Sequence, residues 1–384
     1  MKRKILANAL LAAAIGIPGI SHAQTTYQYI DLGNGAAAGI NDLGQVVGQS
    51  SLGATLWNDA DPVALTFGTG GYATAINNAG QIVGATVAHG IPEAALWQGS
   101  TLASLNGTGG GLTYANGING AGEIVGGADN MAAVWNSRLP TDLGMSGGYS
   151  IAANGINSSG EVVGSAVSSS GATVAAVWKN ADPIALDSLG GNYSDAYAVN
   201  NAGIVVGTAN TAASSTTYIA TEWNGTSVTA LGSLGGTKSY AYAINNAGVI
   251  VGASTDAAGN FYATLWNGKN AVNLNSMLDP AIAKEGWVLT LATGVNNKGW
   301  IIGDAINAKL GEADAFVLEV VDPVPEPGTW AMLLAGLCLF GILRNAKQRT
   351  KAGTNAGTKA ARKMPLDMSP LFLRQVRPNS YMHP

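Results

Sequence analysis

The sequence predicts an all-β protein with a repeat architecture, a seven-bladed β-propeller, framed by a signal peptide and a short C-terminal transmembrane helix. A nine-residue motif recurs seven times at spacings of 36 to 51 residues, and periods near 40 residues are typical of solenoids and propellers. The 384 residues include 53 glycines, which favours many tight turns, and only 11% of the residues are charged. An open β-solenoid is the alternative, although its coils usually have shorter and more uniform periods.

The motif contains an aliphatic residue, Asn, two variable residues, Gly and a β-branched run that ends in Gly. In INNAGVIVG, at 244–252, strand-like alternation precedes the Asn, and a β-branched strand follows the first Gly. Asn can hydrogen-bond its own backbone and Gly supplies a positive φ, so Asn-x-x-Gly predicts a hairpin turn. The predicted turn residues are Asn41, Gly44, Asn77, Gly80, Asn119, Gly122, Asn157, Gly160, Asn200, Gly203, Asn245, Gly248, Asn296 and Gly299.

Two more strands complete each unit. A third run ends in an aromatic residue, and a fourth run follows it, as in 62–65 and 183–186. Four short strands in about 40 residues are typical of a propeller blade. The regular place of the aromatic residues favours a packing role in the blade core, and sugar-binding platforms are the alternative. These residues are Trp57, Trp97, Trp135, Trp178, Trp223, Trp266 and Phe316.

The start of the body predicts how the repeats close. The seventh unit has three recognisable strands, the last at 316–321, whereas the segment 27–33 resembles the fourth strand and exit turn of the other units. If this N-terminal strand pairs with the last unit, seven four-stranded blades form a closed ring. Closure would remove most of the exposed strand edges.

Residues 1–23 are typical of a secretory signal peptide. A basic stretch at 2–4 precedes an apolar stretch at 5–17, and small residues lead to a cleavage site between Ala23 and Gln24. A retained membrane anchor is the alternative. The apolar stretch is too short to span a bilayer comfortably, which favours cleavage.

A second apolar segment lies near the C-terminus. Pro325 and Pro327 precede an uncharged, mostly apolar run at 330–343, and Arg344 begins a basic cluster. At ~1.5 Å per residue this helix is shorter than the ~30 Å hydrocarbon core, so spanning would need local thinning and snorkelling of the basic side chains. The positive charge predicts that the C-terminal side stays in the cytoplasm.

The order of these three parts resembles the sorting signal of PEP-CTERM proteins. The residues that carry the resemblance are Val324, Pro325, Glu326, Pro327 and Arg344. In that family the signal is read by exosortase, a membrane protease-transpeptidase of Gram-negative bacteria that make exopolysaccharide. The resemblance implies export, transient anchoring in the inner membrane, processing near Pro-Glu-Pro, and delivery to the cell surface or matrix.

The chain departs from that family by continuing for 35 residues after Arg349. Such signals usually end just after the basic cluster. The tail at 350–384 lacks apolar periodicity and is expected to be disordered. A plain tail anchor, which would keep body and tail in one polypeptide, is the alternative to processing.

The repeats resemble extracellular HAF repeats, whose consensus reads A-I-N-N-x-G-x-I-V-G followed by Trp. The resemblance covers 27–321 and implies export, but it assigns no chemistry. The expected domains are a signal peptide at 1–23, a HAF-repeat propeller at 24–322, a sorting signal with its transmembrane helix at 323–349, and a basic tail at 350–384.

The sequence predicts no catalytic, cofactor-binding or metal site. A Ser-His-Asp triad would depend on His89, which lies in a predicted exposed loop, and Cys338 is the single cysteine, inside the apolar run. The paired acids are expected to be solvated turn residues, with weak Ca²⁺ sites or a glycosidase pair as alternatives. These acids are Asp59, Asp61, Asp182, Asp187, Asp195, Glu312 and Asp314.

The charge distribution restricts the partners. Residues 24–343 hold seven Lys and Arg against 22 Asp and Glu, so a nucleic acid is excluded, and the basic residues gather at the two ends beside apolar segments. The expected partners are exosortase, the secretion machinery, the inner membrane and exopolysaccharide.

The expected function is that of an exported surface or matrix protein with a structural or binding role, and not that of an enzyme. A lectin-like propeller is the first alternative, and it would place aromatic side chains on loops at one face. A polysaccharide-acting enzyme is the second alternative, and it would place converging carboxylates at the central channel.

Overall fold

The computed structural model describes residues 26–321 except 60, 66–69, 89, 106, 108–110, 137–138, 145–148, 180–181 and 213–215. The chain divides into two compact parts, 1–323 and 324–384. Ala23, Gln24, His89, Cys338, the sorting segment with its predicted helix, and the tail lie outside the described residues. Among the described residues, no helix has the length and apolar character that a membrane crossing requires.

Antiparallel strands dominate the described chain. Three sheets have four strands each. Their strands are β5 (Tyr72–Ile76), β6 (Gln81–Ala88), β7 (Ile91–Gln98), β8 (Thr101–Ser104), β9 (Thr113–Ile118), β10 (Ile124–Ala128), β11 (Met131–Trp135), β12 (Pro140–Asp142), β13 (Tyr149–Ile156), β14 (Val162–Val167), β15 (Thr173–Lys179) and β16 (Asp182–Ala185).

Two larger sheets in the described residues each combine two sequence repeats. The first contains β25 (Trp287–Val295), β26 (Ile301–Asn307), β27 (Glu312–Val321), β1 (Thr26–Ile40), β2 (Val46–Ser50), β3 (Gly53–Asn58) and β4 (Asp61–Ala64). The second contains β17 (Ser194–Val199), β18 (Ile204–Asn210), β19 (Tyr218–Asn224), β20 (Ser227–Ala230), β21 (Gly235–Ile244), β22 (Ile250–Asp256), β23 (Phe261–Asn267) and β24 (Asn270–Asn273).

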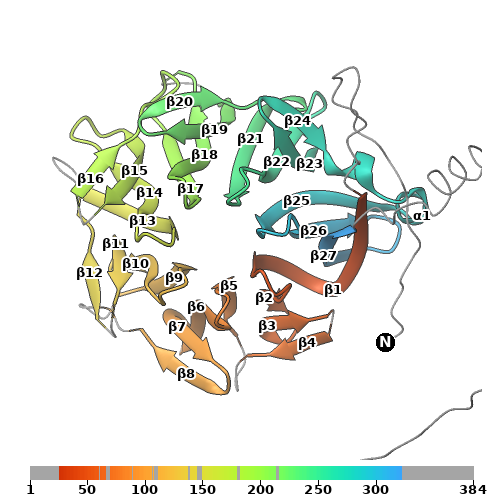
Figure 1. Ribbon diagram of the computed structural model, residues 1–384, viewed down its shortest axis with the longest axis horizontal. Helices are drawn as coiled ribbons and strands as arrows, with labels where there is room; N and C mark the ends of the chain where they lie inside the picture. Colours follow the sequence, from red (N-terminus) through yellow and green to blue (C-terminus); the bar gives the residue numbers. More distant parts are fainter. Residues whose placement is uncertain are drawn as a thin grey trace, which may run out of the picture. The chain divides into compact units, whose positions relative to one another are not determined.

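The strands form repeats of four that stand side by side around a central axis (Figure 1). Repeat 1 consists of the second half of β1 with β2 to β4. Repeats 2 to 6 take the next five groups of four, from β5–β8 to β21–β24. Repeat 7 consists of β25, β26, β27 and the first half of β1. In each repeat the first strand lies closest to the axis (Figure 1).

Strand β1 belongs to two repeats at once. Its first half pairs antiparallel with β27, from Thr26 opposite Val321 to Asn34 opposite Asp314. Its second half pairs with β2, from Gly35 opposite Ser50 to Ile40 opposite Val46. The predicted pairing of the N-terminal strand with the last repeat is therefore confirmed.

The hydrophobic core lies between neighbouring repeats. Val47 of repeat 1 packs in one cluster with Trp97 of repeat 2, and Val206 of repeat 5 packs with Trp266 of repeat 6. Each of the seven recurring aromatic residues is at most 3% exposed. The packing role predicted for them is confirmed, because side chains buried to this degree offer no platform to a ligand.

The connection between repeats 6 and 7 contains helical elements that the repeat pattern does not predict. A 3₁₀ helix, η1 (Leu274–Met277), is followed by a short helix, α1 (Pro280–Glu285). Asp279 accepts a hydrogen bond from the backbone N–H of Ala281, and Gly286 ends the helix at φ 105°. This insertion accounts for the longest spacing between two motifs. Its Asp-Pro start and Gly stop are helix signals visible in the sequence.

Candidate functional site

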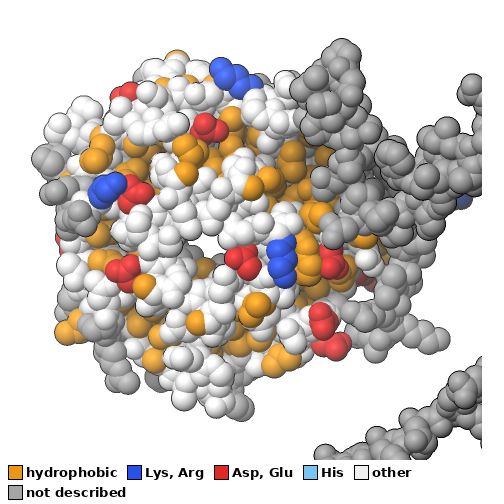
Figure 2. Space-filling view, viewed as in Figure 1, with side chains coloured by type: hydrophobic (Ala, Val, Ile, Leu, Met, Phe, Trp, Pro, Cys, Tyr) orange, Lys and Arg blue, Asp and Glu red, His pale blue; other side chains and the backbone are white. Residues whose placement is uncertain are grey.

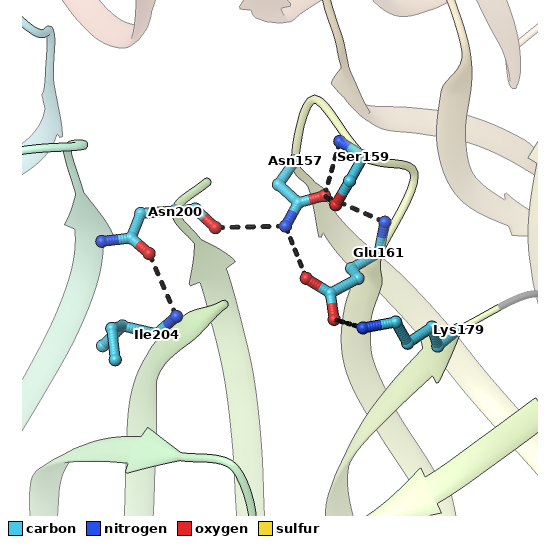
Figure 3. A network of polar contacts seen from close by, with 6 residues as sticks. All are labelled: Asn157, Ser159, Glu161, Lys179, Asn200 and Ile204. Atoms are coloured by element: carbon cyan, nitrogen blue, oxygen red, sulfur yellow. Dashed lines mark hydrogen bonds and ion pairs between the residues drawn. The ribbon is translucent and has the colours of Figure 1, made fainter. Parts of the chain in front are cut away.

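Each predicted turn is organised by its Asn side chain. In repeat 4, Asn157 Oδ1 accepts hydrogen bonds from the backbone N–H groups of Ser159 and Glu161, both at 3.0 Å. Its Nδ2 donates to Glu161 Oε2 at 2.8 Å and to the carbonyl of Asn200 in the next repeat at 3.1 Å. Lys179 pairs with the same Glu161 at 3.0 Å (Figure 3). A single amide thus satisfies the turn of one repeat and contacts the following repeat.

The contact between repeats recurs at every turn of the described chain and returns to its starting residue. Every Asn amide donates to the carbonyl of the equivalent Asn in the next repeat, and these side chains are only 3% to 6% exposed. The bonds run from 41 to 77, 77 to 119, 119 to 157, 157 to 200, 200 to 245, 245 to 296 and 296 to 41, at 2.9 to 3.2 Å. Buried hydrogen bonds of this kind are costly to lose, because an unpaired buried amide or carbonyl is left behind. We call this set of Asn residues the asparagine ring.

The glycines of these turns, three residues after each Asn, all have φ between 74° and 87°. That is the left-handed region, which costs little for Gly and is unfavourable for residues with a Cβ. The Gly N–H donates to the carbonyl of its Asn, as in Gly160 to Asn157 at 3.2 Å.

A second row of bonds lies on the exposed side of the asparagine ring. Asp42 accepts hydrogen bonds from the amides of Asn78 and Asn297 at 2.9 and 3.0 Å, across the two seams that flank repeat 1. Partial burial opposes ionisation, but these bonds and the nearby Lys298 hold the pKa of the Asp42 carboxyl below its ordinary value. Equivalent bonds join repeats 4 to 7. The backbone N–H groups of Ser158, Asn201 and Asn246 each donate to the side-chain Oδ1 of an Asn in the next repeat.

A further set of contacts between repeats is made three residues before the Asn in repeats 2, 3, 4 and 7, where the inner strand bulges. Thr74 donates to the carbonyl of Ala115, and Thr293 donates to the carbonyl of Ala37, both at 2.7 Å. Asn116 donates to the carbonyl of Ala153 at 2.9 Å. Each acceptor belongs to the next repeat, so these side chains join the inner strands around the axis.

Repeats 5 and 6 carry tyrosines at and near these inner positions. Tyr197 and Tyr242 occupy the bulge position, with ring centroids 5.2 Å apart. Tyr240 lies 5.9 Å from Tyr242 and 6.2 Å from Tyr218. Further ring contacts join Tyr193 to Tyr218 at 5.5 Å and Phe261 to Tyr240 at 6.2 Å. We call these six residues the tyrosine cluster, and they come from strands or their ends and not from the loops that the lectin alternative expects.

The expectation that the acids are solvated turn residues is wrong for Asp195 and Asp314. Asp195 lies within β17, where Asn154 of the preceding repeat donates to Oδ1 at 3.0 Å. Burial raises the pKa of the Asp195 carboxyl to about 6, although hydrogen bonds from Ser165 and Asn154 oppose the rise. Asp314 is 7% exposed, and burial with the neighbouring Asp31 and Glu312 raises its pKa to about 6. Asp59, Asp61, Asp187 and Glu312 are exposed, as expected, and the side chain of Asp182 lies outside the described residues.

Asp304, which sequence reasoning overlooked, behaves in the same way. Burial in β26 raises the pKa of its carboxyl to about 6, while the backbone N–H of Ala37 donates to it at 3.2 Å. Among the described residues, no group of three or more His, Cys, Asp and Glu side chains is placed to hold a metal ion. Asp195 and Asp304 sit at different seams, between repeats 4 and 5 and between repeats 7 and 1.

These buried acids predict a specific dependence of stability on pH. The folded pKa of Asp195, about 6, exceeds its ordinary value of 3.8, so the folded chain binds more protons than the unfolded chain between these values. The free energy of unfolding therefore falls as the pH rises from 4 to 6 and stays reduced above pH 6. Asp195→Asn should stabilise the protein at pH 8 by on the order of 2 kcal/mol and have little effect below pH 4.

Urea unfolding of the Asp195→Asn variant at both pH values measures this difference. Asp187→Asn, at an exposed position in the connection that follows β16, is the matched control and should change neither value. A gain for Asp195→Asn that is the same at pH 4 and pH 8 would contradict the ionisation argument.

The comparisons with known proteins concern mostly the C-terminal segment. Residues 323–348 match the PEP-CTERM protein-sorting motif. The match includes every residue predicted for the sorting signal, from Val324 to Arg344. It indicates an exported protein that is sorted by exosortase and anchored in a membrane before processing.

Two further comparisons concern the body. No curated protein matches the chain. Among solved structures, TolB from Acinetobacter baumannii is similar over 62% of this chain and 63% of its own, with 11% identity and a TM-score of 0.40. The chain therefore spans less than two thirds of the length of that protein, and a likeness at this level carries no functional argument.

Proposed function

We propose that residues 24–322 form a closed seven-bladed propeller of HAF type, which exosortase delivers to the cell surface or matrix of a Gram-negative bacterium. There it has a structural or binding role and not an enzymatic one. The observation that carries the proposal is the PEP-CTERM match at 323–348, directly after the repeat body. A sorting signal in this place makes the repeat body the delivered part.

Two features of the fold support closure of the propeller. The asparagine ring returns from Asn296 to Asn41, over 255 residues of sequence, with a bond of 3.0 Å. Strand β1 supplies the outer strand of repeat 7 and the inner strand of repeat 1. A ring joined in this way has no unpaired seam between its ends.

The chemistry of the convergent polar groups supports a structural or binding role. The amides of the asparagine ring are engaged with backbone groups of their own turn and of the next repeat. The same holds for Thr74, Asn116 and Thr293 near the axis. Polar groups committed to backbone contacts stabilise a framework and are not available as nucleophiles or bases.

Exosortase processing predicts that body and tail separate. One epitope is placed in the exposed hairpin loop between β22 and β23, and another after Arg349, in a host that has exosortase. The body epitope should leave the membrane fraction, and the two epitopes should no longer migrate in one polypeptide. The reason is that Pro325-Glu326-Pro327 would act as the recognition element while the run at 330–343 holds it at the membrane.

The control for this experiment changes Pro325, Glu326 and Pro327 to alanine. In that variant both epitopes should stay together in the membrane fraction, because the apolar run and Arg344 are intact and only recognition is lost. Joint migration of both epitopes in the unchanged chain would instead support a plain tail anchor. In a host without exosortase, joint migration of both epitopes is expected whether the segment is a sorting signal or a plain tail anchor.

A further inference from the structure

The tyrosine cluster concentrates aromatic side chains on one part of an aromatic-poor chain. Aromatic residues make up 7% of the sequence, yet five of its 12 tyrosines, with Phe261, form this connected set of rings on repeats 5 and 6. The recurring tryptophans already fill the cores between repeats. The cluster is therefore additional to the aromatic residues that the fold needs.

The rings of the cluster are accessible, unlike the tryptophans. Phe261 is 40% exposed, and Tyr193, Tyr218 and Tyr240 are half-buried. Tyr72 and Tyr114 occupy the position of Tyr240 in repeats 2 and 3, opposite Ala85 and Gly127 as Tyr240 is opposite Ala253. That position thus accepts Tyr in several repeats, but among the described residues a chain of ring contacts extends from it only in repeats 5 and 6.

Polar groups accompany the rings without giving the surface a strong charge. The Asp195 carboxyl is held by Asn154 and lies between Tyr193 and Tyr197 in sequence. Burial is the main cause that raises the pKa of both tyrosine hydroxyls, and the negative charge of Asp195 raises it further. Lys238 is exposed and stands opposite Tyr218 in the one parallel bridge between β19 and β21. Figure 2 shows one face of the body, on which most of the surface is uncharged and the few Lys and Arg side chains appear among acidic ones. Asp195 and Lys238 are of opposite charge, and Asp256, next to Thr255 that pairs with Phe261, adds one further acid.

We propose that the tyrosine cluster is a binding surface for a neutral polysaccharide. Tyrosine offers a rigid apolar face with a polar hydroxyl at its edge, and it loses little conformational entropy on binding. The C–H face of a pyranose can lie on such a ring, while sugar hydroxyls exchange hydrogen bonds with the tyrosine hydroxyls. The acidic body, with 22 Asp and Glu against seven Lys and Arg in 24–343, disfavours polyanionic polymers.

This inference deepens the binding role proposed above. It rests on that proposal only for the cell surface or matrix as the location where the protein would meet polysaccharide. Its test uses the purified full-length chain in detergent, so it does not depend on sorting. The probes are beads carrying neutral glucans with β-1,4, β-1,3 or α-1,4 linkages or a β-1,4-mannan, with polygalacturonate beads as the acidic comparison. The chain should be retained by at least one neutral polymer and not by polygalacturonate.

Variants then assign retention to the cluster. Tyr240→Ala removes the ring with three neighbours and should weaken affinity for the retained glycan about tenfold. Tyr240→Phe keeps the stacking face and should lose much less. Tyr72→Ala removes a tyrosine at the same repeat position outside the cluster and should bind like the unchanged chain, with a melt confirming that each variant is folded.

Two results would overturn the inference. The first is absence of retention on every neutral polymer. The second is retention that Tyr240→Ala leaves unchanged or that Tyr72→Ala reduces equally. Because sorting is read from the two epitopes and binding from the purified chain, failure of one experiment does not affect the other.

Discussion

Deleting Tyr27–Leu32 should destabilise the protein more than any loop deletion. The deletion removes the strand that pairs with β27, including Tyr29 opposite Leu318 and Asp31 opposite Phe316. Leu32 is buried at 6% exposure, and its carbonyl accepts the indole N–H of Trp57 at 3.1 Å. Burial of side chains of this size is worth about 1.5 to 3 kcal/mol each, so the expected loss is ~5 kcal/mol. The melting temperature should fall by roughly 10 °C.

The loss of stability should exceed what the lost contacts alone account for, because the strand also joins the first repeat to the last. Tyr29 stacks on Phe316 with ring centroids 6.2 Å apart, and Phe316 belongs to the core between repeats 6 and 7. Without this strand, repeat 7 exposes the edge of β27, and the seam with repeat 1 depends on side-chain bonds such as Asn296 to Asn41.

The matched control replaces the loop 211–216, between β18 and β19, by Asn-Gly, a sequence that favours a tight hairpin turn. This change shortens a connection without removing a strand. Thermal melts of the two variants decide the matter, with the signal peptide kept in both so that the mature chains begin at the same residue. Equal melting temperatures would count against closure through β1.

The repeat framework could be predicted because its determinants are local. Asn157 bonds to backbone groups two and four residues away, so the turn follows from the spacing of Asn and Gly alone. The tryptophan is the last or the penultimate residue of the third strand in each of the first six repeats, so its role could be inferred from regularity. The contact from Asn157 to Asn200 is different, since it depends on how closely two sheets approach each other.

The features missed by sequence reasoning arise between repeats. Asp195 resembles a turn acid in the sequence, but it is partly buried and hydrogen-bonded by Asn154 and Ser165, which lie 41 and 30 residues earlier in the chain. The tyrosine cluster draws on positions from 193 to 261, and only sheet adjacency brings them together. One signal was available, since tyrosine recurs five residues before the Asn in repeats 2, 3 and 6.

Gly164→Ala should be among the most damaging single substitutions in the body. Gly164 ends the repeated motif in repeat 4 and lies in β14 opposite a bulge of the inner strand β13. A Cβ at this position would overlap the carbonyl oxygen of Ala152 and lie 3.0 Å from the Cα of Ala153. These obstacles are backbone atoms, which cannot rotate away as a side chain can. The expected cost is about 3 kcal/mol, the upper range for overpacking.

The same close approach explains why every motif ends in Gly. In each repeat of the described chain the added Cβ would overlap an inner-strand carbonyl oxygen, at Gly48, Gly84, Gly126, Gly164, Gly207, Gly252 and Gly303. The requirement is steric, because none of these glycines has a positive φ. The glycines of the turns have a different requirement, a left-handed φ, and at Gly80 and Gly248 an added Cβ would meet no atom within 4 Å.

Gly160, four residues earlier in the same repeat, is the matched control. Its φ is 80°, and a Cβ there would meet only Glu123 Oε2 at 3.5 Å, an ordinary contact. Gly160→Ala should therefore cost about 1 kcal/mol, from backbone strain alone. Urea unfolding of both variants in the full chain measures the difference, and Gly164→Ala should be the worse by roughly 2 kcal/mol. Equal costs, or a larger cost at Gly160, would show that the inner strand can move away from β14 and that the motif keeps its final Gly for another reason.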